Sequence, residues 1–411
     1  MMEKEKKIGL LVLIVTMGFS ISVFYHYAQG IYLGKPYPDN TFLFSPGDKF
    51  NDFYNVVRGS ADLDPYRPGK IYPYFAFGSF VAYLFSLIKP WAVSWLIFLL
   101  LFFSSFILLA KYYLYGLRSK LNSQQLLTIF VFVFLTYPVI FAVDRSNFDL
   151  LISLLIFLFA ITYGKHKFII STIPLAMAIA IKPYAVVFAI VYIINKKLKE
   201  ALLLIFNTSL LTVFSLIFYK DGLFVEIQKF IVATVAYEKS MTDGVIFHFS
   251  SDLYNFLIII VRFVSKLFGS EINLLGNPTF ILIYTIAAIV IFILITIYLL
   301  KKPQPFWKVM AILTILIILL PCSTNDYRLV YLFVPLLMYL VSNNKSRLDM
   351  PTIILWGLLL IPKNYYTISE DQNIGMIINP LLLIGLLILL VFYRTPKMIP
   401  GNKNSLYPVI Q

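Results

Sequence analysis

The chain has 411 residues, of which 60% are hydrophobic, 17% aromatic and only 13% charged, with a formal net charge of +14. Soluble domains carry about 25% charged residues, so this composition excludes a soluble enzyme as well as a fibrous or disordered chain. The single cysteine excludes a disulfide framework. Long uncharged apolar blocks approach the roughly 20 residues that a helix needs to cross a bilayer. They predict an all-α, polytopic membrane protein.

The first element in chain order is a helix over residues 8–30, and its apolar stretch is too long for a cleaved signal peptide. Pro183 predicts a break after Lys182, since the residue before a proline seldom continues a helix. With the first helix, the following crossings give a single membrane domain of about 12 transmembrane helices over residues 1–411. They are expected at about 90–113, 124–143, 149–163, 168–181, 183–195, 201–219, 278–300, 306–321, 328–342, 351–363 and 376–394.

Two long segments are expected to be extracytoplasmic loops: residues 31–89, with juxtamembrane helices, and residues 220–277. In the first, Asp52 is followed by Phe53, Val56 and Val57, which fall on one helical face. Such a helix would hold the Asp52 carboxylate beside the membrane surface. A carboxylate near a low-dielectric surface has a raised pKa, which suits proton abstraction from a hydroxyl group. The alternative is an ordinary solvated loop.

Polar residues also stand at membrane boundaries, at 144–149, Lys182 and 325–328. Ionisable groups at membrane depth are costly and usually functional. The alternative is that neighbouring charges only pair with each other, as Asp144 would with Arg145. Lys182 has no acidic residue nearby in the sequence, so we expect a bound phosphate to supply its counter-charge.

The distribution of basic residues predicts the orientation. With a cytoplasmic N-terminus, 19 of the 34 Lys and Arg residues but only four of the 20 acidic residues fall in cytoplasmic segments. This alternation requires that residues 71–88 lie in the outer leaflet and do not cross. We therefore expect a multi-pass protein of the plasma (inner) membrane with both termini cytoplasmic and the active site extracytoplasmic. Anionic lipid head groups, and not nucleic acid, are the expected partners of the surplus basic charge.

Several short motifs follow one another along the chain: Asp52-Phe53-Tyr54, Arg58-Gly59, Asp64-Pro65-Tyr66, Tyr72-Pro73, Arg145-Ser146-Asn147-Phe148-Asp149-Leu150, Lys182-Pro183 and Pro321-Cys322-Ser323-Thr324-Asn325-Asp326-Tyr327. With these motifs, residues 8–342 resemble the GT-C class of integral-membrane glycosyltransferases, and specifically glycosyltransferase family 87. Two positions depart from the family pattern: Tyr74 replaces a second proline, and Arg145-Ser146 replaces Gly-Gln, so the donor or acceptor is expected to differ from those of mannose-using relatives.

The resemblance implies a GT-C-like helical bundle and transfer of a hexose, mannose-like, from a polyprenyl-phosphate sugar to a glycan or glycolipid. Asp52 would take the proton from the acceptor hydroxyl, which attacks the anomeric carbon with inversion. Candidate ligands of the donor phosphate are Lys182, Arg328, Arg58 and Arg145. Candidate substrate-binding residues are Tyr54, Asp64, Tyr66, Tyr72, Asn147, Asp326, Tyr327 and His248. No cofactor is expected, although Asp62-Leu63-Asp64 leaves a divalent metal open.

Two other functions remain open. A glycan polymerase or ligase with diphosphate-linked donors would use basic residues of the 220–277 loop, such as Lys229. A lipid or sugar transporter is less favoured, because transporters tend to show repeated halves and matched broken helices, whereas this sequence has one broken pair and polar loops on one side.

Overall fold

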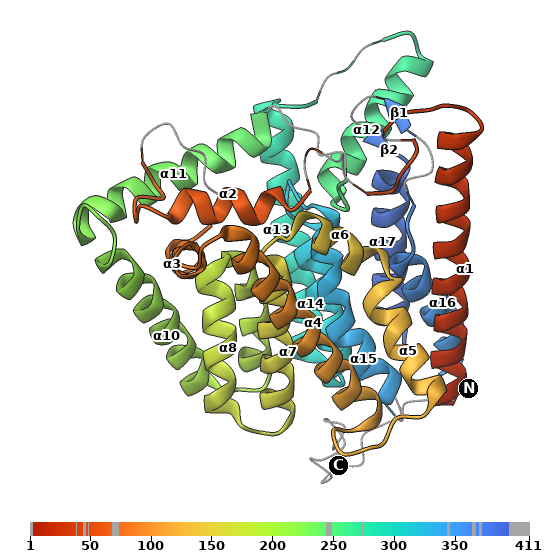
Figure 1. The fold of residues 1–411 in the computed structure, drawn as a ribbon, viewed down its shortest axis with the longest axis horizontal. Helices are drawn as coiled ribbons and strands as arrows, with labels where there is room; N and C mark the ends of the chain where they lie inside the picture. Colours follow the sequence, from red (N-terminus) through yellow and green to blue (C-terminus); the bar gives the residue numbers. More distant parts are fainter. Residues whose placement is uncertain are drawn as a thin grey trace. The chain divides into compact units, whose positions relative to one another are not determined.

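The computed structural model describes residues 3–37, 39–43, 47, 49–67, 74–243, 249–270, 272, 274–342, 346–363, 367–369 and 372–393. Within these residues the chain forms 17 α-helices and short 3₁₀ helices (Figure 1). Two short antiparallel strands, β1 (Thr367–Ser369) and β2 (Gln372–Asn373), are the exception in an otherwise helical fold. The predicted helical fold class is thus confirmed, apart from these two short strands.

The helices fall into two compact units. Unit 1 comprises Met1–Lys49, Ile107–Asp144 and Thr242–Gln411, and unit 2 comprises Phe50–Phe106 and Arg145–Met241. The helices of unit 1 are α1 (Lys4–Ile31), α5 (Ser123–Phe134), α6 (Tyr137–Arg145), α12 (Leu253–Leu267), α13 (Pro278–Lys301), α14 (Phe306–Leu319), η3 (Asp326–Leu332), α15 (Phe333–Val341), α16 (Asp349–Leu360) and α17 (Gly375–Phe392). The helices of unit 2 are α2 (Asn51–Ser60), α3 (Ala76–Ser86), α4 (Trp91–Tyr115), α7 (Asp149–Gly164), α8 (Phe168–Ile181), η2 (Pro183–Ala189), α9 (Ile190–Ile194), α10 (Leu198–Ile217) and α11 (Leu223–Asp243). The unit boundaries fall just before α2, within α4, before the last residue of α6 and near the end of α11.

Five helices are long and apolar enough to cross a membrane: α1, α4, α10, α13 and α17. The predicted crossing at 124–143 is a bent pair, α5 and α6, with 49° between the two helices, and counts as a sixth span if the pair is one crossing. Other predicted crossings, such as those at 149–163 and 306–321, are apolar helices of 10–17 residues. Several spans support an integral membrane protein, whereas twelve crossings remain a prediction.

The core of unit 1 is built around α14. Every residue of α14 is buried, as expected of a helix that is apolar on all sides and surrounded by protein. Small residues bring α1 and α16 close together, since a Cβ added at Gly357 would lie 2.7 Å from the Ile14 side chain. By contrast, only Tyr284 and Leu299 of α13 are buried. The long apolar surface of α13 is therefore available to lipid.

In unit 2, α8 packs between α7 and α10, and Figure 1 shows α2 running crosswise to these three helices. The short helix α3 lies against the end of α8: a Cβ added at Gly78 would lie 3.0 Å from the Ile181 carbonyl oxygen. The Phe75 N–H donates to that same oxygen at 3.2 Å. These contacts hold the residues before α3, including Tyr74, beside the point where α8 ends.

The predicted break at Lys182 is confirmed. Helix α8 ends at Ile181, Lys182 is extended with φ −145° and ψ 126°, and η2 begins at Pro183. Proline fits the first position of a helix because its missing N–H would have no partner there. The break turns the Lys182 side chain into the interior of unit 2, where it is buried.

Candidate functional site

Asp52 lies in the first turn of α2, where the helix dipole stabilises a negative charge. The predicted apolar face is confirmed, because Phe53, Val56 and Val57 are buried. The Phe53 ring packs against the Phe98 ring, with 5.2 Å between the ring centres. Other aromatic rings surround it. This face fixes α2 on unit 2 and leaves the Asp52 carboxylate at the edge of the packed interior, with its side chain 17% exposed.

The turn between α6 and α7 supplies two partners of Asp52. Arg145 forms an ion pair with the Asp52 carboxylate through Nη2, and Asn147 Nδ2 donates to Asp52 Oδ2 at 2.7 Å. Ser146 between them has a left-handed φ of 50°, which is uncommon for a residue with a side chain. Its hydroxyl accepts a hydrogen bond from the Trp95 indole at 2.9 Å. The ion pair thus joins Arg145 to a carboxylate that lies 93 residues away in the sequence, and the pairing of Arg145 with its neighbour Asp144 stays a prediction.

Lys182 is held by Asp149, with 2.5 Å between Lys182 Nζ and Asp149 Oδ2. The Asp149 side chain is fully buried and that of Lys182 is 7% exposed. The Tyr184 hydroxyl donates to the other Asp149 oxygen, and the Lys182 ammonium lies 4.7 Å from the centre of the Tyr74 ring. The expectation that a ligand must supply the counter-charge of Lys182 was therefore wrong, because Asp149 supplies it from 33 residues away in the sequence.

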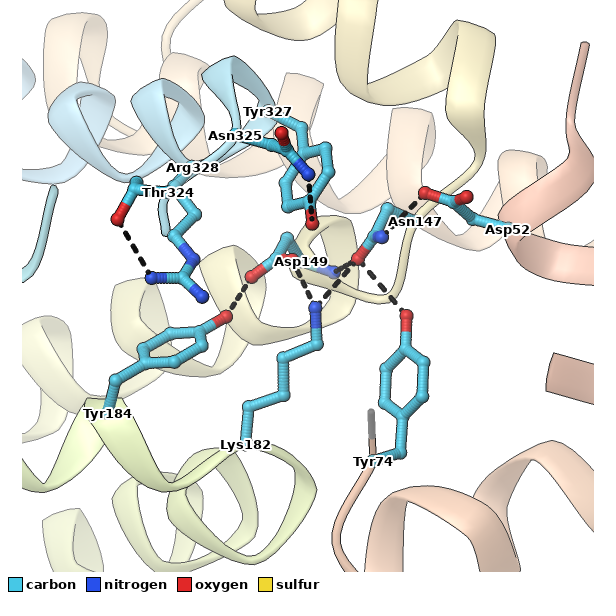
Figure 2. Close-up of polar contacts among 10 residues, drawn as sticks. All are labelled: Asp52, Tyr74, Asn147, Asp149, Lys182, Tyr184, Thr324, Asn325, Tyr327 and Arg328. Atoms are coloured by element: carbon cyan, nitrogen blue, oxygen red, sulfur yellow. Dashed lines mark hydrogen bonds and ion pairs between the residues drawn. The ribbon is translucent and has the colours of Figure 1, made fainter. Parts of the chain in front are cut away.

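Asn147 lies between Asp52 and Lys182, one member of each ion pair, and Figure 2 shows its hydrogen bonds to both. Its Oδ1 accepts hydrogen bonds from Lys182 Nζ at 3.0 Å, from the Tyr74 hydroxyl at 3.2 Å and from the Asp149 N–H at 3.0 Å. Its Nδ2 donates to Asp52. The oxygen thus faces an ammonium group and the nitrogen faces a carboxylate, an orientation that the two neighbouring charges favour. The amide of Asn147 therefore contacts both Asp52 and Lys182.

The arrangement brings together three of the residues predicted for catalysis or phosphate binding, Asp52, Arg145 and Lys182, with Asn147 from the predicted substrate-binding set. They come from α2, the α6–α7 turn and the α8–η2 break. Sequence reasoning noted Asp149 as a boundary residue and Tyr74 as a departure from the family pattern, yet assigned neither to the site. No pattern in the sequence singled out Tyr184.

Other predicted residues of unit 2 lie elsewhere. Arg58 is exposed and follows Asp52 by six positions, about 120° around the helix axis. Tyr54 is half-buried beside the Phe53 ring. The buried Tyr66 hydroxyl donates to the Tyr74 carbonyl at 2.9 Å, so Tyr66 holds the chain before α3.

The remaining predicted residues belong to unit 1 or lie outside the residues that the structure describes. Buried Asp326 accepts hydrogen bonds from the Tyr137 hydroxyl at 2.8 Å and the Ser251 hydroxyl at 2.5 Å. The Tyr327 hydroxyl accepts from Asn325, and Arg328 Nη1 donates to the Thr324 hydroxyl at 3.3 Å. Convergence of Arg328 with Asp52 stays a prediction. Tyr72 and His248 lie outside the described residues.

A second charged cluster in unit 2 surrounds Lys229. Its ammonium contacts Asp64 at 2.8 Å, Glu226 at 3.2 Å and also Asp221. Burial lowers the pKa of Lys229, but hydrogen bonds to these acids outweigh that effect and raise the pKa above its usual value. Burial raises the pKa of Glu226. Oxygens of the three carboxylates lie within 4.8 Å of one another, close enough to hold a metal ion. The Lys229 ammonium already stands among these oxygens and is an ion-pair partner of Asp64, and the predicted role of Asp64 in substrate binding stays a prediction.

The comparison with known proteins identifies a family. The model of glycosyltransferase family 87 matches residues 71–324, more than half of the chain. The match includes the 145–149 turn and Lys182-Pro183. No curated protein matches the chain.

Proposed function

The chain belongs to glycosyltransferase family 87, and on that premise we propose that this membrane glycosyltransferase uses a polyprenyl-phosphate sugar as its donor. The sugar is a hexose, mannose-like, and the acceptor is a hydroxyl group of a glycan or glycolipid. The single observation that carries the proposal is the connection of Asp52 to Lys182 through Asn147. The Asn147 side chain joins the Asp52 carboxylate, at the edge of the interior, to the buried Lys182 ammonium. A transferase that uses a lipid-phosphate donor needs such an arrangement, with a base beside a group that binds an anion.

In the proposed reaction Asp52 is the general base. The acceptor oxygen attacks the anomeric carbon, its proton passes to the Asp52 carboxylate, and a new carbon–oxygen bond forms. The bond from the anomeric carbon to the phosphate oxygen breaks, and polyprenyl phosphate leaves with the electron pair. One displacement of this kind inverts the anomeric configuration. The leaving phosphate needs no general acid, because it departs as an ionised group.

Basic side chains would stabilise the charge of the departing phosphate. Arg145 offers a planar set of donors that fits a phosphate in a bidentate manner, and Lys182 offers a compact positive charge. Both stand in ion pairs before the donor arrives, and charge that is already in place is worth more in a site with little water than in solution. Arg328 and Arg58 remain weaker candidates for the same role.

We further propose that the site opens on the extracytoplasmic face of the plasma membrane, with both termini cytoplasmic and about 12 crossings. The orientation and the number of crossings are supported by the excess of Lys and Arg in alternate segments, whereas the five or six helices long enough to span a bilayer support only the membrane location.

The donor class is tested with purified protein in lipid nanodiscs, supplied with matched polyprenyl-monophosphate and polyprenyl-diphosphate hexoses. We expect transfer from the monophosphate donor. Transfer from the diphosphate donor alone would overturn the proposal in favour of a polymerase or ligase. Lys229 is enclosed by three carboxylates, which outnumber its single positive charge and would repel a phosphate, and this weighs against that alternative. Movement of a sugar lipid across the membrane with no covalent product would identify a transporter.

A further inference from the structure

The charges of the candidate site cancel in pairs. Asp52 is paired with Arg145, and Asp149 is paired with Lys182. A donor phosphate therefore enters a set of groups whose charges already balance. An anion brought into a poorly solvated environment needs a partner of opposite charge, so of these two cations the better phosphate ligand is the one that can exchange its carboxylate for the phosphate.

Lys182 is poorly suited to this exchange. Its partner Asp149 is fully buried, and removal of the ammonium would leave an uncompensated charge in the interior, which is strongly unfavourable. Lys182 is also tied to the Asn147 oxygen and lies over the Tyr74 ring. The contacts on every side fix it where it is.

Arg145 is well suited to the exchange. Its side chain and that of Asp52 are each 17% exposed, so both stand at the accessible edge of the site. If Arg145 leaves, Asp52 keeps the hydrogen bond from Asn147 Nδ2 at 2.7 Å and stays in position. The guanidinium group also fits a phosphate as well as it fits a carboxylate.

We infer that the donor phosphate takes Arg145 away from Asp52, so that binding of the donor releases the catalytic base. This inference rests on the proposed function and adds an order of events to it. While Arg145 is paired with Asp52, the carboxylate is a weak base because the adjacent positive charge stabilises its ionised form. When Arg145 moves to the phosphate, Asp52 becomes a stronger base. The acceptor hydroxyl is then activated only when a lipid phosphate occupies the site.

The experiment measures how fast dicyclohexylcarbodiimide, which reacts with protonated carboxyl groups, modifies Asp52 in nanodiscs. The modified peptide is quantified by mass spectrometry with and without polyprenyl phosphate, the product that lacks the sugar. We expect polyprenyl phosphate to increase the labelling rate of Asp52 at least threefold. Arg145→Gln should label rapidly without the lipid and show no further increase. Arg118→Gln, which replaces an exposed arginine in unit 1, should behave as the unaltered protein.

Unchanged or slower labelling of Asp52 when polyprenyl phosphate is bound would overturn the exchange, as would an increase of the same size in Arg145→Gln. The comparison of unaltered protein with and without lipid does not depend on the folding of any variant. A separate transfer assay distinguishes the two proposals. If Asp52→Asn abolishes transfer but the lipid does not alter labelling, the exchange is wrong and the role of Asp52 stands. If Asp52→Asn transfers sugar normally, the proposed base is itself wrong.

Discussion

Lys182 and Asp149 form an ion pair in the interior of unit 2, with 2.5 Å between Lys182 Nζ and Asp149 Oδ2. The pair connects the break between α8 and η2 with the first residue of α7. Removing one partner of a buried pair typically costs about 3–5 kcal/mol, whereas removing both can be nearly neutral.

Variants of this pair should separate stability from activity. Asp149→Asn and Lys182→Met alone should each lower the midpoint of thermal unfolding in detergent, because each leaves one buried charge. The double variant Asp149→Asn/Lys182→Met should recover much of the stability and remain inactive in sugar transfer, since the cation is gone. A double variant that regained transfer would show that Lys182 has no chemical role.

Asp52→Asn should lower the rate of sugar transfer by about 10²- to 10⁴-fold, the usual contribution of a general base. The amide has nearly the same shape as the carboxylate, so thermal stability should change much less than activity. Asp62→Asn is the matched control, because Asp62 belongs to the same loop and is half-exposed in an ion pair with Arg67. Its transfer rate should stay within twofold of the unaltered protein.

Gly78→Ala should weaken the packing of α3 on α8. The new methyl group would lie 3.0 Å from the Ile181 carbonyl oxygen, so α3 or the residues next to Lys182 must shift. We expect a lower unfolding midpoint and reduced transfer. Gly164→Ala is the control, because no atom lies within 4 Å of the added Cβ and alanine favours helix by up to about 1 kcal/mol. Equal effects of the two substitutions would contradict the packing argument.

Stability should depend on pH through Asp252 of unit 1. Burial raises the pKa of Asp252 to about 6, although hydrogen bonds from Asn255, Ser250 and Thr324 oppose the shift. The unfolded chain has a pKa of about 3.9 at such a group, so the folded state binds the proton more tightly. The resulting stabilisation is complete below about pH 3.9 and is lost as pH rises through 6.

The unfolding midpoint of the unaltered protein should therefore fall between pH 5 and pH 7 by more than that of Asp252→Asn. Differential scanning fluorimetry in one detergent checks both proteins across this range. Parallel curves would rule out Asp252 as the source of the dependence.

The topology is tested with cysteine labelling. The lone Cys322 is first replaced, as Cys322→Ser, and a new cysteine is introduced at an exposed position of α2, as Asn55→Cys. A membrane-impermeant maleimide added to intact cells should label this variant. A cysteine at Lys199, in a predicted cytoplasmic segment, should react only after the membrane is permeabilised. The reverse pattern would place Asp52 in the cytoplasm and end the proposal of an outer-face site.

Local structure in the site could be predicted where it depends on neighbours in the sequence. The spacing of Phe53, Val56 and Val57 indicated α2 and its buried face, and Pro183 indicated the break after Lys182; the structure confirms both features. Both follow from rules that act over one or two helical turns.

Contacts between distant segments could not be predicted in this way. Asp149 and Lys182 are 33 residues apart, and Asp52 and Asn147 are 95 residues apart. Their meeting depends on how α2, α7 and α8 pack. Tyr66 illustrates the same limit, since the hydrogen bond from its hydroxyl to the Tyr74 carbonyl could not be predicted from the sequence, and its role in substrate binding stays a prediction. The role of a polar side chain depends on which backbone comes to lie beside it.

The exposure of α13 has a consequence for the membrane around the protein. A helix of 24 residues extends about 36 Å at 1.5 Å per residue, more than the ~30 Å of a typical hydrocarbon layer. The excess is accommodated by tilt or by local thickening of the bilayer. Because so few α13 side chains are buried, a change of tilt disturbs little of the packing around α14. We therefore expect α13 to adjust its tilt to bilayers of different thickness with little strain on the core of unit 1.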